Sequence, residues 1–223
     1  MKLPRRIILA FFCLASFSVQ AKDSVQVWKR HLVFGLYSVA YKGSLQNSYA
    51  RWTPAYQLGI RFQMRKHVDG QFHVSFGRFI GEDRDYKLPS RASIGVSPAS
   101  RFESRFFAMV YETQFRLFRY KGFKLFFSQG IGLFRFSVRD WDGNRLLERD
   151  RTREKGETYR EISLMLPTRL GIAHQFQNGL TLGLQAGWMN TMSRYLDNMD
   201  KLSNNDNRDN LAIFLFQAGY PLR

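Results

Sequence analysis

Three side chains in this sequence have the types and spacing of a hydrolase or acyltransferase site. His73 and Ser75 are two residues apart, which puts them on one face of an extended strand, and Glu112 offers a carboxylate that could orient a base. Serine beside histidine is common in strands, however, and nothing in the sequence brings these three groups to an open rim. We therefore expect no catalytic residues and a protein that is not an enzyme.

Metal and thiol chemistry have less support. The single cysteine, Cys13, lies in an N-terminal segment that looks removable, so the rest of the chain offers no disulfide, no cysteine-ligated metal and no cysteine nucleophile. The four histidines show no spacing typical of a metal-ligand set. We expect neither a metal nor a cofactor.

Basic side chains form the other candidate site. Arg116, Arg119, Lys121 and Lys124 flank Gly122, which is more charge than a hairpin turn needs. The formal net charge of +16 and the pI near 10.3 would suit nucleic acid, but the export signal and membrane pattern described below outweigh that interpretation. Two explanations stay open: contact with anionic lipid headgroups, or a rim that docks an acidic periplasmic partner.

The first 21 residues are typical of a secretory signal peptide. A basic segment, 2–6, precedes an apolar run, 7–15, and Ala21 suits signal peptidase. The expected mature chain, 22–223, forms one domain with a net charge of +13, because the leader carries Lys2, Arg5 and Arg6 and no acid. No later segment reaches the length of about 18 apolar residues expected of a membrane-spanning helix.

Most of the remaining chain alternates between apolar and polar residues, the period of a β-strand. The alternation is clear in 56–65, 163–175 and 180–188, and weaker in 72–80, 105–117 and 123–136. Segments 30–42 and 210–220 are apolar on both faces, so their outward face is ambiguous. These eight segments have the length of about 9–11 residues that crosses a bilayer when tilted. Large apolar residues would face lipid, among them Leu58, Ile60, Leu164, Leu170, Leu182 and Leu184.

The connections predict the topology. Three connections are short, and each contains a glycine after Asp, Lys or Asn, as hairpin turns do: 66–70, 119–122 and 177–179. They alternate along the chain with four long connections: 43–53, 81–103, 138–158 and 190–209. Outer-membrane barrels have short periplasmic turns and long extracellular loops. We therefore predict an all-β fold: an eight-stranded antiparallel transmembrane β-barrel in the outer membrane. A soluble lipocalin-like barrel or sandwich is the weaker alternative.

Charge and bulk predict what fills the barrel. The four long loops have no net charge in sum, so the positive charge lies in the strands, short turns and tails. An eight-stranded barrel has an interior that side chains fill, so a pore is not expected. We expect Phe79, Phe118, Phe134 and Arg61 to point inward. An internal ion-pair network would join Arg61, Arg105 and Arg169 to Glu112 or Glu161.

Three short motifs resemble a known family. Residues 191–199, TMSRYLDNM, resemble the T-D-Y-L-D-D-V motif of small Bacteroidota outer-membrane barrels of the PorG-like group. Gly156-Glu157-Thr158-Tyr159, with Leu166-Pro167 and Gly171, and the segment 101–106 resemble the same group. Two positions depart from the motif, Ser193 and Asn198, which leaves Tyr195, Leu196 and Asp197 as the matched residues.

The resemblance implies a function as well as a fold. It implies a non-enzymatic scaffold component of the type IX secretion system, taking part in protein transport and linked to a periplasmic lipoprotein ring. Outer-membrane lipids are the other expected partner, and no nucleic acid is expected. The alternative is a free-standing surface barrel, either an adhesin or a lipid-acting enzyme.

Overall fold

The computed structural model describes residues 30–46, 48–83, 85–87, 92–93, 95–202 and 209–222. The expected signal peptide, 1–21, lies outside these residues. So do Lys22, Lys29 and Arg223, three basic residues outside the strands that add to the positive charge expected at the short-turn end. Within the described residues, no helix is long and apolar enough to cross a membrane.

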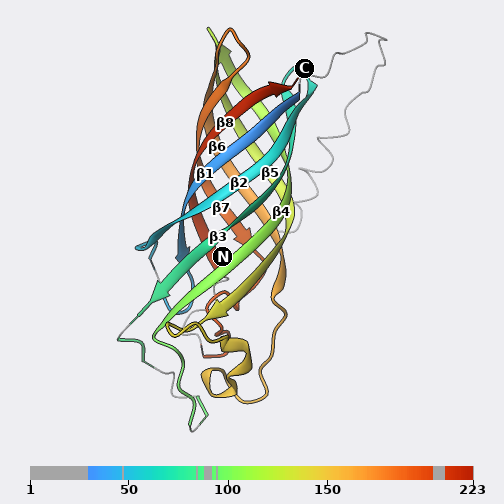
Figure 1. The fold of residues 1–223 in the computed structure, drawn as a ribbon. Coiled ribbons are helices and arrows are strands. Elements are labelled where there is room, and N and C mark those ends of the chain that lie inside the picture. Colours follow the sequence, from blue (N-terminus) through green and yellow to red (C-terminus); the bar gives the residue numbers. More distant parts are fainter. Residues whose placement is uncertain are drawn as a thin grey trace, which may run out of the picture.

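Eight strands form one closed antiparallel barrel, as the alternation predicted (Figure 1). Each strand pairs with its neighbours in sequence, and β1 pairs with β8 over its whole length, from Arg30 with Leu222 to Lys42 with Asn210. The strands are β1 (Arg30–Lys42), β2 (Trp52–Arg65), β3 (Val68–Glu82), β4 (Arg101–Tyr120), β5 (Phe123–Arg139), β6 (Ile162–Gln175), β7 (Thr181–Thr191) and β8 (Asn210–Leu222). Two short 3-10 helices, η2 (Leu146–Glu148) and η3 (Asp150–Thr152), lie in the loop between β5 and β6.

The three short turns gather at one end of the barrel and the long loops at the other, as expected (Figure 1). Lys121 and Gly122 form a two-residue turn with positive φ values of 43° and 86°, which matches the twist of the paired strands. The turn between β2 and β3 is shorter than the predicted connection 66–70. It consists of residues 66 and 67, whereas Asp69 and Gly70 belong to β3, because Arg65 pairs with Val68 after a bulge in β2.

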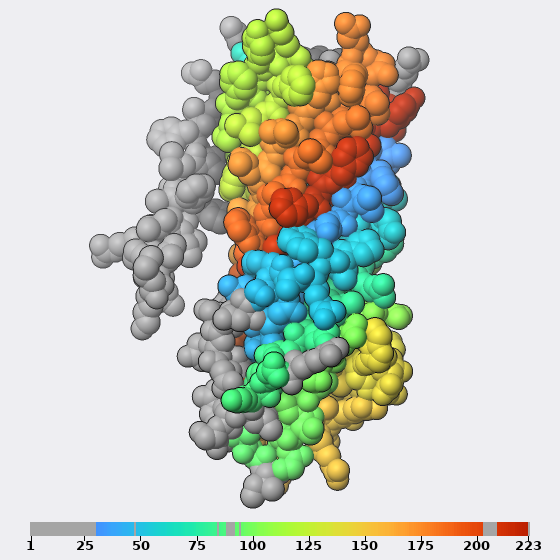
Figure 2. Space-filling model, turned by 90° about the vertical axis from the view of Figure 1, so that its left-hand side faces the viewer, coloured from blue at the N-terminus to red at the C-terminus, as the bar shows by residue number. Residues whose placement is uncertain are grey.

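The outer wall is apolar. Large hydrophobic side chains cover it from β1 through β8, and most of them are 40–60% exposed. We call this apolar outer surface the lipid-facing belt. Aromatic residues border it, with Trp52 and Trp188 towards the long loops and Tyr120 and Tyr220 towards the short turns. Figure 2 shows part of the wall as one elongated surface. A water-soluble protein rarely exposes so continuous an apolar surface, whereas a barrel in lipid requires it.

The lumen has two layers. Towards the short turns it is lined by polar side chains, including Gln57, Gln71, Glu112 and Arg169. Towards the long loops it is filled by a hydrophobic cluster, including Tyr41, Phe79, Phe102, Phe106, Phe134, Phe136, Met165, Met189 and Ile213. This apolar layer explains why 30–42 and 210–220 are apolar on both faces: Phe34 and Phe214 face outward, whereas Val39 and Ile213 face the cluster.

Two inward assignments were wrong. Arg105 is seven residues from Glu112, an odd separation, so strict alternation turns it outward, where its side chain is 67% exposed beside Glu103. Phe118 is 59% exposed because a bulge between Arg116 and Phe118 shifts the register of β4 against β5. Phe79, Phe134 and Arg61 point inward as expected.

The belt predicts a depth-dependent penalty for charge. Leu184 lies in the middle of the outer face of β7, between Ile172 and Phe216 in the sheet register. We expect Leu184→Arg to lower the free energy of unfolding by about 2–4 kcal/mol in lipid vesicles, because the guanidinium enters hydrocarbon. Leu184→Met should change it little. Equal stability of the two variants in urea titrations would contradict the assignment of this face to lipid.

Candidate functional site

A buried ion pair crosses the middle of the lumen. The Arg169 guanidinium on β6 lies 3.1 Å from the Glu112 carboxylate on β4, and both side chains are fully buried. The contact is an ion pair and not a hydrogen bond, because the guanidinium N–H groups are not directed at the carboxylate oxygens. Arg169 Nη2 also donates to the Tyr37 hydroxyl on β1, at 3.0 Å, and Tyr37 donates in turn to Gln57 on β2. The predicted pairing of Arg169 with Glu112 is therefore confirmed, and it ties together strands that are not neighbours in the sheet.

Glutamines fill the same level of the lumen. Gln71 Oε1 accepts hydrogen bonds from Gln114 at 3.2 Å and from Gln217 at 3.4 Å, and Gln217 Oε1 accepts one from Gln185 at 3.1 Å. This chain of amides reaches from β4 through β3 and β8 to β7. Together with the apolar layer beyond it, it closes the lumen to solutes.

The sequence-selected trio of His73, Ser75 and Glu112 lies inside this plug. All three side chains are fully buried, and the His73 ring lies 3.5 Å from the Gln71 side-chain amide. No route from lipid or water reaches the serine hydroxyl through the packed layers described above. The arrangement has the burial of a structural core rather than the access that a hydrolytic site requires.

Two of the four residues predicted to form a docking rim at the short-turn end do not face outward. Arg116 and Lys124 turn inward, where each side chain is 12% exposed and pairs with Asp69, at 3.4 Å and 3.1 Å. Arg119 and Lys121 stay exposed as predicted. Asp69 was missed as a site residue, although it shares a strand face with Gln71 and His73, so strict alternation would have turned it inward.

Exposed cations nevertheless lie at this end of the barrel, on β1 and around the turns after β2 and β4. We call Arg30, Arg65, Lys66, Arg119 and Lys121 the cationic rim; all five are exposed. Among the described residues at this end, Asp69 is the one acidic residue, and its carboxylate is already held by Arg116 and Lys124. The rim therefore presents positive charge with no compensating carboxylate in the described part of the chain.

The long-loop end is closed by a folded cap, which consists of residues 140–161 and 192–202 together with Asp209. Asp197 anchors it: its carboxylate accepts hydrogen bonds from the Tyr41 hydroxyl at 2.7 Å, the Leu45 amide at 2.9 Å and the Met199 amide at 3.0 Å. Asp209 accepts a hydrogen bond from the Leu196 amide at 2.7 Å, and its carboxylate also lies 3.1 Å from the Tyr41 hydroxyl.

Of the motif residues, Leu196 and Asp197 are thus buried anchors of the loop, and Tyr195 is half-buried and stacks on Tyr159. Asn198, where the motif has Asp, adopts a left-handed φ of 71° that asparagine tolerates. Its side-chain oxygen accepts from Arg153 at 2.9 Å and from Tyr159 at 3.0 Å, and its amide donates to Thr152 at 2.8 Å. The predicted inward role of Glu161 was wrong, since Glu161 pairs with Arg145 in this cap at 2.6 Å.

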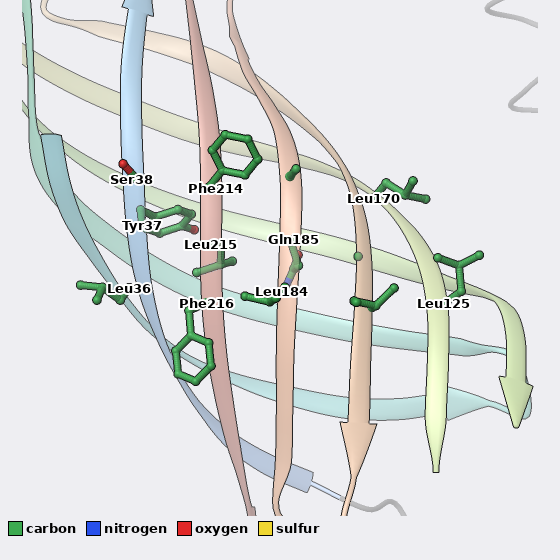
Figure 3. Close-up of a pocket in the computed structure, with 13 residues that line it drawn as sticks. Leu36, Tyr37, Ser38, Leu125, Leu170, Leu184, Gln185, Phe214, Leu215 and Phe216 are labelled. Atoms are coloured by element: carbon green, nitrogen blue, oxygen red, sulfur yellow. The ribbon is translucent and has the colours of Figure 1, made fainter. Parts of the chain in front are cut away.

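The surface of the barrel has two larger hollows. A ledge of about 470 Å³ lies beside the cap and includes Tyr159, Tyr195, Arg160 and Arg194. An apolar groove of about 540 Å³ lies on the outer wall over β1, β5, β6, β7 and β8 (Figure 3). It forms where Ala186 stands between Leu170 and Phe214 in register, so a small side chain separates two large ones. The groove belongs to the lipid-facing belt. Within the described residues, no group of three or more metal-ligating side chains comes together.

Solved structures share this fold. No protein family and no curated protein matches the sequence. Neisserial surface protein A is 9% identical, with a TM-score of 0.53 over 86% of this chain and 96% of that one. Ail, the attachment invasion locus protein of Yersinia pestis, is 10% identical, with a TM-score of 0.49 over 87% and 99%. The outer membrane enzyme PagL is 15% identical, with a TM-score of 0.40 over 86% and 99%. At these identities the likeness shows the fold alone, that of small outer-membrane β-barrels.

The central ion pair predicts a non-additive effect on stability. Glu112→Gln or Arg169→Met leaves one buried charge without its partner, so each should lower the free energy of unfolding by about 3–5 kcal/mol. The double variant should lose less than the sum, because it removes both charges. The exposed Arg105, 3.1 Å from Glu103, provides the control, and Arg105→Met should cost about 0–1 kcal/mol. Additive losses in urea unfolding would show that the two groups act separately.

The buried carboxylates of Asp197 and Asp209 predict that the stability of the cap depends on pH. Burial raises the pKa of Asp197 to about 6, and burial with repulsion from Asp197 raises the pKa of Asp209 well above its usual range. A raised pKa in the folded state means that protonation stabilises the cap, so its stability should fall as the pH rises through about 6. We expect the amides of Leu45, Leu196 and Met199 to exchange hydrogen faster at about pH 7.5 than at about pH 5, after correction for intrinsic rates.

The matched variants for that measurement are Asp209→Asn and Asp200→Asn. Asp209→Asn removes one buried carboxylate and its repulsion, so the pH dependence should shrink. Asp200 lies near the cap surface and pairs with Arg194, so Asp200→Asn should leave the dependence intact. Unchanged protection across the pH range in the unsubstituted protein would contradict the prediction.

Proposed function

We propose that this chain is a non-enzymatic barrel of the outer membrane that acts as a membrane-embedded scaffold. The proposal rests on the contrast between the interior and the short-turn end of this barrel. The lumen of the closed barrel is filled by side chains, whereas the short-turn end presents the cationic rim to its surroundings. A filled lumen supports neither conduction nor solute transport, so a role must be performed at the two ends or at the wall.

The cationic rim supports a docking role on the periplasmic side. An acidic subunit approaching the rim would meet several exposed cations, and such complementarity raises association rates and fixes orientation. Anionic headgroups of the inner leaflet are the competing occupant. The motif around Tyr195, Leu196 and Asp197 resembles barrels of the type IX secretion system, and on that resemblance the partner is a periplasmic lipoprotein ring.

A second candidate function is binding at the cell surface. The ledge beside the cap favours it, because Tyr159 and Tyr195 offer stacked aromatic faces and Arg160 and Arg194 offer charge. This candidate would place the working surface at the long-loop end and leave the rim to lipid. A lipid-acting enzyme has less support, since the His73 and Ser75 side chains are sealed in the lumen.

The two candidates differ in which end of the barrel matters. We expect deletion of the gene to block export of proteins that carry the type IX C-terminal signal. Complementation with Arg65→Gln, Arg119→Gln and Lys121→Gln combined should restore export several-fold less well than the unsubstituted chain. Each exposed charge contributes little and is screened over about 8 Å at physiological salt, so single variants should have small effects.

The control carries the same charge change at the opposite end: Arg151→Gln, Lys155→Gln and Arg160→Gln combined, all exposed residues. It should complement fully if the rim is the docking surface. Amounts of folded barrel in the membrane, judged by heat-modifiable migration, must be equal in both strains. Intact export without the gene, with altered surface binding, would overturn the scaffold in favour of the surface-binding barrel.

A further inference from the structure

The short-turn end of the barrel contains a small polar cavity that the scaffold role does not use. Its volume is about 80 Å³, and its lining comes from several strands and includes His31, Arg61, Asp69, Arg116, Lys124 and Thr181. Arg119 and Gly122, at the turn between β4 and β5, also line it, so it opens towards this end of the barrel. The space is far below the roughly 300–1,000 Å³ of pockets for organic ligands. It fits a few water molecules or one small oxyanion.

Arg61 is a buried cation in the wall of this cavity. It is 4% exposed, and its register opposite His31 and Gln71 turns it into the lumen. No described residue forms a hydrogen bond or an ion pair with its guanidinium, although Asp69 is near enough to attract it. A buried guanidinium without a partner is costly, so such groups in native proteins are usually bound to a counter-ion or to water.

Two polar atoms of other lining residues also have no hydrogen-bond partner in the described structure: His31 Nε2 and Arg116 Nε. Asp69 is the one carboxylate in the lining, and its two oxygens are already taken by Arg116 and Lys124. Three buried cations against one carboxylate leave two positive charges uncompensated. Inorganic phosphate or a phosphate monoester, with a charge of about −1.5 to −2 at neutral pH, would balance them, whereas a carboxylate or the phosphodiester of a lipid headgroup would balance only one.

We propose that this cavity binds a single phosphate-type oxyanion. The planar fork of Arg61 suits the oxygens of a tetrahedral anion. Arg116, whose terminal nitrogens bind the Lys66 carbonyl and Asp69, still has an unpartnered Nε–H, and Lys124 adds a point charge. The phosphate is free in solution or belongs to a lipid headgroup, since the cavity opens at the end of the barrel that meets the membrane surface. The site depends on the fold and not on the secretion role, so either proposal can fail alone.

The test uses the barrel refolded in a phosphate-free neutral detergent. Inorganic phosphate should raise the midpoint of heat denaturation above that in chloride of equal ionic strength, because a ligand that binds only the folded state stabilises it. Arg61→Gln should weaken phosphate binding about tenfold or more by calorimetric titration. In phosphate-free buffer it should not lower the midpoint, since it removes a buried charge that has no partner. A purely structural Arg61 would lower the midpoint in both buffers, which would overturn the proposal.

A second variant and two controls keep the test decisive. Arg61→Lys keeps the charge but loses the fork, so phosphate binding should weaken while the fold is preserved. Arg151→Gln, at the long-loop end, and Arg65→Gln, on the rim, should retain the full effect of phosphate. Loss of the effect in Arg65→Gln to the same degree as in Arg61→Gln would mean diffuse binding to the rim and would overturn the site.

A parallel experiment with a phospholipid distinguishes free phosphate from a lipid headgroup as the ligand. Mixed micelles with phosphatidylglycerol, in place of inorganic phosphate, should raise the midpoint in an Arg61-dependent way if a headgroup is the ligand. An effect of either probe that depends on Arg61 supports the site and identifies its source. Acetate acting as strongly as phosphate, or no Arg61-dependent effect of any probe, would leave a water-filled cavity and overturn the proposal.

Discussion

Closure of the sheet is the constraint on which the rest of this structure depends. Hydrocarbon offers no hydrogen-bonding partner to a strand edge, so a sheet in lipid must have no edge. The pairing of β1 with β8 from Arg30 to Lys42 removes the last one. Once the sheet is closed, strand alternation divides every residue between a lipid-facing wall and a lumen, and the polar side chains of the strands have only the lumen in which to be satisfied.

Inside the lumen these side chains are buried against one another, and several of them form hydrogen bonds or ion pairs. The ion pair between Arg169 and Glu112, the Tyr37 hydroxyl and the glutamine chain connect β1, β2, β3, β4, β6, β7 and β8 through side chains at one level. The aromatic cluster around Phe79 and Phe134 occupies the next level. Because both levels are packed, the interior provides rigidity rather than a path, and the accessible surfaces are the two ends of the barrel and its outer wall.

The two ends are built on different principles. The long-loop end is a folded cap, held by the carboxylates of Asp197 and Asp209 and by Arg153, whose guanidinium binds Leu146, Leu147 and Asn198. The short-turn end instead keeps positive charge that the described protein does not compensate, part of it inside with Arg61 and part on the rim. The buried part of this charge is costly without a counter-ion, and it is the basis of the proposed anion site, whereas the exposed part is the basis of the proposed docking role.

The sequence by itself determined the barrel, because period-two alternation, glycine turns and the alternation of short and long connections are local properties of the chain. It also determined that Arg169 and Glu112 face the lumen. It did not determine the outward faces of 30–42 and 210–220, since the apolar layer inside mirrors the lipid outside. Nor did it reveal that Asp69 draws Arg116 and Lys124 inward or that a bulge turns Phe118 outward. Those outcomes were decided by the tertiary structure, because they depend on the register of neighbouring strands and on which side chains meet across the lumen from strands far apart in the chain.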